Sequence, residues 1–141
     1  MREHRYHPWR ALRGLPHVTL RWSAAVARGS VDGHTITLHP LLTQAERRST
    51  LTHELVHLER GPAPSHRAVR EEQLVEEIAA RRLVGLEDLA DAIVWHGGYA
   101  HDCMADDLWV DRAILVARIR ALRPDERAYI EQIVARREET A

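Results

Sequence analysis

Hydrophobic and polar residues alternate in two short segments near the start of the chain, a pattern that predicts β-strands. The segments cover residues 18–22 and residues 34–39. In the second segment, β-branched residues place Ile36 and Leu38 on the same face. Asp32-Gly33, just ahead of it, is typical of a tight hairpin turn. We therefore expect a small antiparallel sheet whose Ile36 and Leu38 face the core.

The first long helical pattern follows the strands, over residues 43–61. Its apolar residues lie four and three positions apart and form one stripe: Leu51, Leu55 and Leu58. Thr43 and Glu46 have the spacing of a capping box, which predicts where the helix begins. Gly61, followed by two prolines within three residues, predicts where it ends. The stripe should pack on the sheet.

Further helical patterns occupy most of the remaining chain. They cover residues 8–13, 65–84, 86–95, 101–108, 112–122 and the stretch from residue 124 onward. Ser65 and Asp111 are expected to cap two of these helices. Strands come early and helices dominate later, which is typical of an α+β fold. We expect one domain over residues 1–141, with the sheet and first long helix in 1–61 and a helical part in 65–141.

Composition narrows the class of protein. The formal charge of −1 provides no general basic field for nucleic acid. Cys103 is the only cysteine, which excludes an internal disulfide and agrees with a reducing cytoplasm. Residues 1–10 lack the apolar core of a secretion signal, and no apolar run has membrane-spanning length. We expect a cytoplasmic protein whose four tryptophans are core or half-buried anchors.

The stretch that carries chemistry is His53-Glu54-Leu55-Val56-His57, which reads H-E-x-x-H. On a helix, His53 and His57 lie on one face about one turn apart, so both imidazoles can bind one metal ion. Glu54 lies beside them, where it could act as general base toward a metal-activated water. The pattern is typical of zinc hydrolases. The alternative interpretation is a pair of solvated histidines on an amphipathic helix.

A catalytic zinc site commonly uses three protein ligands, so a third must come from elsewhere in the chain. The helix predicted over residues 65–84 offers four carboxylates: Glu71, Glu72, Glu76 and Glu77. A different interpretation is that these carboxylates form a solvated face with neighbouring arginines, namely Arg67, Arg70, Arg81 and Arg82. A carboxylate that is not itself a ligand can instead accept a hydrogen bond from the outer nitrogen of a ligand imidazole.

The run over residues 43–83 resembles the ImmA/IrrE-like metallopeptidases, which are gluzincins often encoded by phages and mobile elements. In that family H-E-x-x-H is followed by a helix with the pattern E-x-x-A-[ND]-x-[FW]-A-A. This chain reads Glu72-Gln73-Leu74-Val75-Glu76-Glu77-Ile78-Ala79-Ala80, in which the last two alanines agree and Val75, Glu76 and Ile78 depart. More loosely, residues 8–129 look like small actinobacterial and actinophage members.

The resemblance implies a zincin-type metallo-endopeptidase with one Zn²⁺ held by His53, His57 and Glu72, and with Glu54 as general base. Glu76, one turn after Glu72, is the runner-up third ligand or the hydrogen-bond acceptor of a ligand imidazole. Some relatives cleave a repressor, which implies a DNA-binding regulatory protein as substrate. An extended substrate is expected to pair with the edge of the strand at residues 34–39.

The sequence leaves open which side chain would donate a hydrogen bond to the oxyanion of the transition state. The candidates are histidines and tyrosines outside the motif: His34, His39, His66, Tyr99, His101 and Tyr129.

The sequence also allows two non-enzymatic functions as alternatives to a peptidase. Residues 86–122 can be read as a helix-turn-helix that presents Arg118, Arg120 and Arg123 to DNA. The same stretch contains six aspartates, which is unfavourable for a surface facing DNA, so direct nucleic-acid binding is not expected. The second interpretation is a metal-binding protein without turnover, which would need the two histidines but not Glu54.

Overall fold

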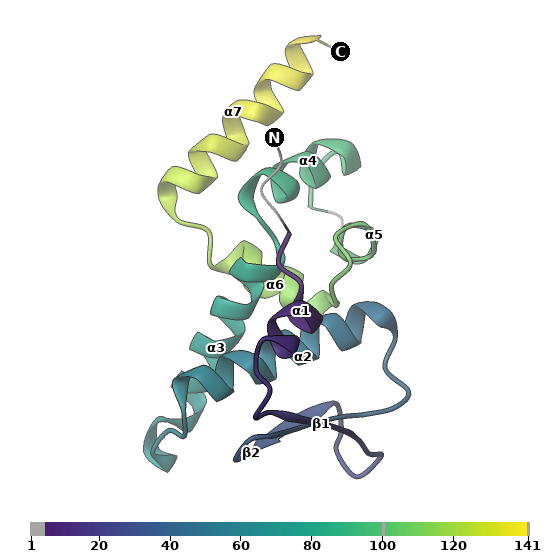
Figure 1. The fold of residues 1–141 in the computed structure, drawn as a ribbon. Coiled ribbons are helices and arrows are strands. Elements are labelled where there is room, and N and C mark those ends of the chain that lie inside the picture. The colour runs from purple at the N-terminus through teal and green to yellow at the C-terminus, as the bar shows by residue number, and fades with distance from the viewer. Residues whose placement is uncertain (1–4, 100, 141) are drawn as a thin grey trace.

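The computed structural model describes residues 5–99 and 101–140, and these residues form an α+β fold, as expected (Figure 1). Residues 1–4, 100 and 141, and the side chain of His101, lie outside the described part. The elements in order are α1 (Pro8–Arg13), β1 (Thr19–Trp22), β2 (Gly29–Asp32), β3 (Thr35–Leu38), α2 (Gln44–Arg60), a 3₁₀ turn (Ser65–Arg67), α3 (Ala68–Leu83), α4 (Leu86–His96), α5 (His101–Asp107), α6 (Arg112–Arg120) and α7 (Pro124–Thr140).

The strands form one mixed sheet in the order β1-β3-β2. β2 and β3 are antiparallel and joined by the predicted turn, in which Gly33 has a φ of +59°. β1, however, pairs with β3 in parallel, with Thr19 opposite Thr35, which corrects the expectation of an antiparallel sheet. The reason is β2, which the sequence pattern missed because Val31 is its single apolar side chain. The chain crosses to β2 at the far edge before it returns as β3.

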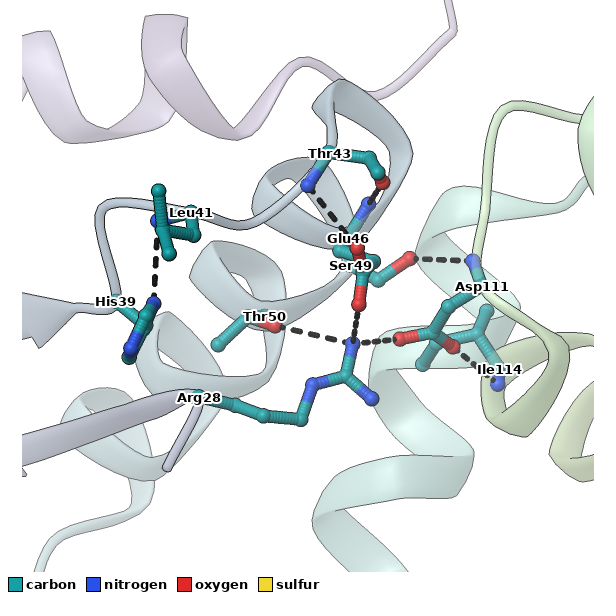
Figure 2. A network of polar contacts seen from close by, with 9 residues as sticks. All are labelled: Arg28, His39, Leu41, Thr43, Glu46, Ser49, Thr50, Asp111 and Ile114. Carbon is teal, nitrogen blue, oxygen red and sulfur yellow. Dashed lines mark hydrogen bonds and ion pairs between the residues drawn. The ribbon is translucent and has the colours of Figure 1, made fainter. Parts of the chain in front are cut away.

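Helix α2 begins and ends where the sequence predicts. The Thr43 hydroxyl accepts a hydrogen bond from the Glu46 amide at 3.2 Å, and the Glu46 carboxylate accepts one from the Thr43 amide at 3.0 Å (Figure 2). This is a complete capping box. Gly61 ends the helix with a φ of +78°, a conformation that favours glycine.

Helix α2 lies between the sheet and the helical part of the molecule (Figure 1). Its sheet side carries the predicted stripe, with Leu51 and Leu55 buried in one core together with Ile36 and Leu38. Its opposite side contributes Val56 to a second core, built mainly by α3, α4 and α6. Because both sides of α2 are buried, its remaining polar strip faces a cleft between the two cores.

Arg48 ties the helical part to the start of α2. Its guanidinium donates hydrogen bonds to four backbone carbonyl oxygens, those of Tyr6 at 3.3 Å, Leu83 at 3.4 Å, Leu108 at 3.3 Å and Trp109 at 3.0 Å. These carbonyls lie before α1, at the end of α3 and after α5. One side chain therefore satisfies backbone acceptors that three different segments bring together.

Two further local predictions have different outcomes. Asp111 caps α6 as expected, since its carboxylate accepts a hydrogen bond from the Ile114 amide at 2.9 Å. Ser65 does not cap α3, because the 3₁₀ turn Ser65–Arg67 precedes it and α3 begins at Ala68 without a side-chain cap.

Within residues 5–99 and 101–140, no helix combines the length and apolar content that crossing a bilayer requires.

The tryptophans are more exposed than predicted. Trp95 is 82% exposed, and Trp109 is also exposed. Trp9 and Trp22 are exposed as well, and they stack on each other with ring centroids 6.3 Å apart. The cores are filled by aliphatic side chains instead, so the tryptophans do not act as core anchors.

The close approach of β2 to α2 depends on Gly29. A Cβ atom at this position would lie 2.6 Å from Cγ2 of Thr50 and 3.2 Å from Cδ2 of Leu38. Threonine has little freedom at χ1 on a helix, so Thr50 cannot easily move aside. We expect Gly29→Ala to lower the free energy of unfolding by about 1–3 kcal/mol, the usual cost of overpacking.

A second substitution tests the cause of that loss. Thr50→Ser removes the obstructing methyl group and keeps the hydroxyl, so the Gly29→Ala/Thr50→Ser variant should recover most of the lost stability. Urea unfolding of the wild type, the two single variants and the double variant measures this coupling. If Gly29→Ala destabilised the Thr50→Ser variant as much as it destabilises the wild type, contact with the Thr50 methyl group would not be the cause.

Candidate metal centre

The polar strip of α2 that faces the cleft brings the two motif histidines together. The rings of His53 and His57 lie with centroids 4.8 Å apart and an interplanar angle of 68°. The N-terminal half of α3 places the carboxylate of Glu72 against both rings. Nε2 of His53 lies 2.6 Å from Oε1 of Glu72, and Nε2 of His57 lies 2.8 Å from Oε2. Two helices therefore converge at one point.

The three side chains form a donor set that suits zinc. One nitrogen of each histidine and one carboxylate oxygen of Glu72 all lie within 4.8 Å of one another. Two imidazole nitrogens and a carboxylate are a common ligand set of catalytic zinc, which leaves a further position for water or substrate. His53, His57 and Glu72 could thus hold one zinc ion.

Glu54 lies next to this group but is held differently. The residue is only 7% exposed, and it borders the cleft beside His53 and His57. Burial raises the pKa of the Glu54 carboxyl above its ordinary value, while the neighbouring histidines oppose the rise. A carboxylate that is partly desolvated holds a proton more readily, which is the property needed by a group that accepts and returns one.

The other carboxylates of α3 occupy separate positions. Glu71 forms an ion pair with Arg60, which lowers the pKa of the Glu71 carboxyl. Glu77 is exposed. Glu76 lies one turn beyond Glu72 and makes no hydrogen bond to either motif histidine within the described part of the chain. The imidazole contacts thus involve Glu72 alone among the four.

One interpretation of the sequence was a solvated face on which these glutamates pair with neighbouring arginines. Two of those arginines pair with carboxylates of other helices instead. Arg81 pairs with Glu126 of α7, and Arg82 pairs with Glu59 of α2. The side of α3 that carries Glu72 and Glu76 is turned toward α2 and β2 and lines the cleft.

The cleft has two compartments that meet at the histidine–glutamate group. His53, Glu54 and Glu72 line both of them. The larger compartment has a volume of about 790 Å³ and follows β2 and the C-terminal half of α2. The smaller compartment has a volume of about 340 Å³ and lies beside Thr50, Glu76 and the start of α6. A ligand in either compartment would therefore lie beside the candidate metal group.

Arg28 lines the small compartment and lies at the centre of a polar network (Figure 2). Its guanidinium forms an ion pair with Asp111 and lies 3.5 Å from Oγ1 of Thr50 and 4.0 Å from a carboxylate oxygen of Glu46. Ser49 Oγ accepts a hydrogen bond from the Asp111 amide at 3.1 Å. This network joins the loop before β2, the start of α2 and the start of α6.

The structure corrects the expected position of an extended substrate. The strand predicted over residues 34–39 is β3, the central strand, whose two edges are already paired with β1 and β2. A central strand cannot accept another strand. β2 is the terminal strand next to it, and all four of its residues line the large compartment. The edge that can pair with a peptide therefore belongs to β2.

One of the possible oxyanion donors reaches the cleft. His34 lines the large compartment, as the motif histidines do. His39 is occupied elsewhere, since its Nδ1 accepts a hydrogen bond from the Leu41 amide at 3.1 Å. His66, Tyr99 and Tyr129 line neither compartment, and the side chain of His101 lies outside the described part.

Arg28 and β2 are parts of the site that the sequence patterns did not indicate. Arg28 lies in a loop without a recognisable motif, and it meets Asp111, its ion-pair partner, across 83 positions of sequence. The hairpin turn at Asp32-Gly33 could have predicted β2, because such a turn has a strand on each side.

Comparison of the chain with family models, with curated proteins and with solved structures finds no match.

Proposed function

We propose that this protein is a zinc-dependent metallo-endopeptidase related to the ImmA/IrrE-like family. The observation that carries the proposal is the convergence of His53 and His57 on the carboxylate of Glu72, with Glu54 beside them, where two compartments of one cleft meet. H-E-x-x-H and a glutamate from the following helix make up a hydrolase donor set.

The mechanism we propose assigns a task to each of these side chains. His53, His57 and Glu72 would hold one zinc ion. The ion, when bound, would supply Lewis acidity that polarises the scissile carbonyl and acidifies a water molecule. Glu54 would accept a proton as water adds to the carbonyl carbon, and would deliver it to the departing amine as the C–N bond breaks. The products are a carboxylic acid and an amine.

The cleft supports binding of an extended peptide. The large compartment follows the chain from His53 to Gly61, about 12 Å at 1.5 Å per residue. An extended chain rises about 3.3 Å per residue, so roughly four residues of substrate would lie in it. The free edge of β2 would pair with the peptide backbone, which provides affinity with little dependence on side chains.

The class of substrate follows from the family resemblance. We propose a regulatory protein, such as a DNA-binding repressor of a phage or other mobile element, as the substrate that contains the cleaved peptide bond.

The single cysteine, Cys103, is a free thiol at the surface, which supports a reducing cytoplasm as the location. His34, in the wall of the large compartment, is our candidate for the oxyanion donor.

Direct DNA binding is less well supported. Arg118, one of three arginines that a helix-turn-helix would present, is buried and bonded to Glu126 and to the Val84 carbonyl. Arg120 remains on the exposed side of α6. A metal-binding protein without turnover shares the same ligands, and the requirement for Glu54 separates it from the peptidase.

Metal content is the first test of the proposal. Protein purified without chelator or metal-binding tag should contain about one zinc ion per chain, the number that the one three-ligand group found in residues 5–99 and 101–140 can hold. His53→Ala and Glu72→Gln should each weaken zinc binding by more than the roughly 10- to 100-fold that loss of an outer hydrogen-bond partner costs. Elemental analysis and competition with a chelating dye measure the stoichiometry and the affinity.

Two variants of α3 serve as controls. Glu77→Gln removes an exposed carboxylate and should leave zinc binding unchanged. Glu76→Gln should also leave it nearly unchanged, because Glu76 does not contact the histidines. A stronger loss in Glu76→Gln than in Glu72→Gln would move the third ligand by one turn. Wild-type protein that takes up no zinc on titration would refute the metallopeptidase.

A further inference from the structure

Glu76 is an ionisable side chain of the small compartment that has no partner. Within residues 5–99 and 101–140 it makes no hydrogen bond and no ion pair, although it is partly buried. Of the other charged groups around the compartment, Glu54 is the largely buried carboxyl next to the two histidines. Asp111 is bound by Arg28 and caps α6, and Glu72 contacts the two histidines.

The uncompensated charge of the small compartment is therefore negative. Arg28 is the one arginine among the described residues that line either compartment, and Asp111 and Glu46 already surround it. A divalent ion at the histidines would be offset by the carboxylates of Glu54 and Glu72. Glu76 then remains as an acceptor that can bind a positively charged group by a charge-assisted hydrogen bond.

Size and wall composition restrict what can enter. A volume of about 340 Å³ is at the lower end of ligand pockets, which suits one side chain and not a length of backbone. Ala27, Ala113 and Ile114 form an apolar part of its wall. A compartment lined by both apolar side chains and a carboxylate suits a side chain with an aliphatic stem and a cationic head, which describes lysine and arginine.

The small compartment lies next to the proposed catalytic residues. Glu76 follows Glu72 by four residues, about 6 Å along α3 at 1.5 Å per residue. The compartment opens directly onto His53 and Glu54. A side chain that enters it would belong to a substrate residue next to the bond being cleaved.

We propose that the small compartment selects a lysine or arginine beside the scissile bond and that Glu76 is the residue that recognises it. This inference rests on the proposed peptidase function and specifies its substrates. It assigns Glu76 a role in specificity and none in metal binding.

Cleavage of a peptide library tests the specificity. Zinc-loaded wild-type protein is incubated with peptides of mixed sequence, and mass spectrometry identifies the cleaved bonds. Lysine and arginine should be enriched at one position beside those bonds. For matched peptides that differ only there, arginine should exceed norleucine in kcat/KM by about 10- to 100-fold, the range expected for a hydrogen bond to a charged group.

Variants of Glu76 identify the residue responsible. Glu76→Gln should remove this preference while cleavage of the norleucine peptide continues, and Glu76→Asp should retain part of it. Glu77→Gln, on the exposed side of α3, should behave as wild type. A wild-type enzyme that cleaves without preference for lysine or arginine would overturn the inference and leave the peptidase standing. Loss of zinc from Glu76→Gln would also overturn it, because Glu76 would then act on the metal site.

A binding measurement separates this inference from the proposed function. Calorimetry or NMR titration compares N-acetyl-arginine amide with N-acetyl-norleucine amide on zinc-loaded protein. Preferential binding of the arginine compound, lost in Glu76→Gln, would support the assignment even if no peptide were hydrolysed, in which case the peptidase proposal alone would fail. Equal binding of the two compounds would refute the assignment.

Discussion

Replacement of Glu54 by glutamine is expected to abolish peptide hydrolysis while zinc remains bound. The substitution keeps the size of the side chain and removes its ability to take up and return a proton. General acid–base groups contribute about 10²- to 10⁴-fold to rate, so kcat should fall by at least that range. The proposed ligands His53, His57 and Glu72 are untouched, and metal content should match the wild type.

The measurement combines turnover, metal content and folding. Turnover is followed by mass spectrometry on the peptide library, with Glu77→Gln as a control that changes a glutamate outside the cleft. Circular dichroism checks that the Glu54→Gln variant is folded, since Glu54 is largely buried. Undiminished turnover in Glu54→Gln would exclude Glu54 as the general base. Zinc binding with no turnover in the wild type on any substrate, the predicted repressor included, would favour a binding protein.

Glu126→Gln is expected to cause the largest loss of stability. The Glu126 carboxylate receives hydrogen bonds from Arg81 at 2.6 Å and 3.2 Å, from Arg118 at 3.4 Å and from the Arg123 amide at 2.9 Å. Arg118 is 2% exposed and would lose its charged partner. Removal of one partner from a buried ion pair typically costs about 3–5 kcal/mol. The cluster joins α3, α6 and α7, so its loss should lower the stability of the whole helical part.

The acid dependence of this effect has a definite sign. The bond to Arg81 lowers the pKa of Glu126 to about 2 from an ordinary 4.5. A carboxyl with a lowered pKa stabilises the fold above its ordinary pKa, and the contribution is lost as the pH falls toward its folded pKa. The difference between the two values corresponds to about 3 kcal/mol. Wild type and Glu126→Gln should therefore differ most above about pH 5 and converge as the pH falls toward 2.

Denaturant unfolding at pH 7, 5, 4 and 3 would measure this convergence, with Glu131→Gln on the exposed side of α7 as the matched control. A difference between wild type and Glu126→Gln that is small at pH 7, or that grows toward pH 3, would contradict the assigned role of the ion pair.

Local signals in the sequence were sufficient for most elements. The capping box of Thr43 and Glu46, the stop at Gly61 and the cap at Asp111 involve groups within a few residues of each other, so the chain specifies them without distant contacts. The strand that the sequence did not predict, β2, lacks such a local signal. β2 carries a single apolar residue and forms because β3 pairs with it and α2 packs on it, and propensity alone does not indicate a strand of that kind.

The sequence by itself determined the α+β class, the helix that holds His53, Glu54 and His57, and their shared face, because helical periodicity follows directly from residue spacing. Tertiary structure decided that Glu72, the glutamate implied by the family resemblance, is the one of α3 that meets the two imidazoles, since that contact requires α3 to pack on α2. It also decided that the sheet edge beside the cleft belongs to β2 and that Arg28 meets Asp111 beside the site. Those features depend on contacts between residues far apart in the chain, which packing of the two cores brings together and no local pattern encodes.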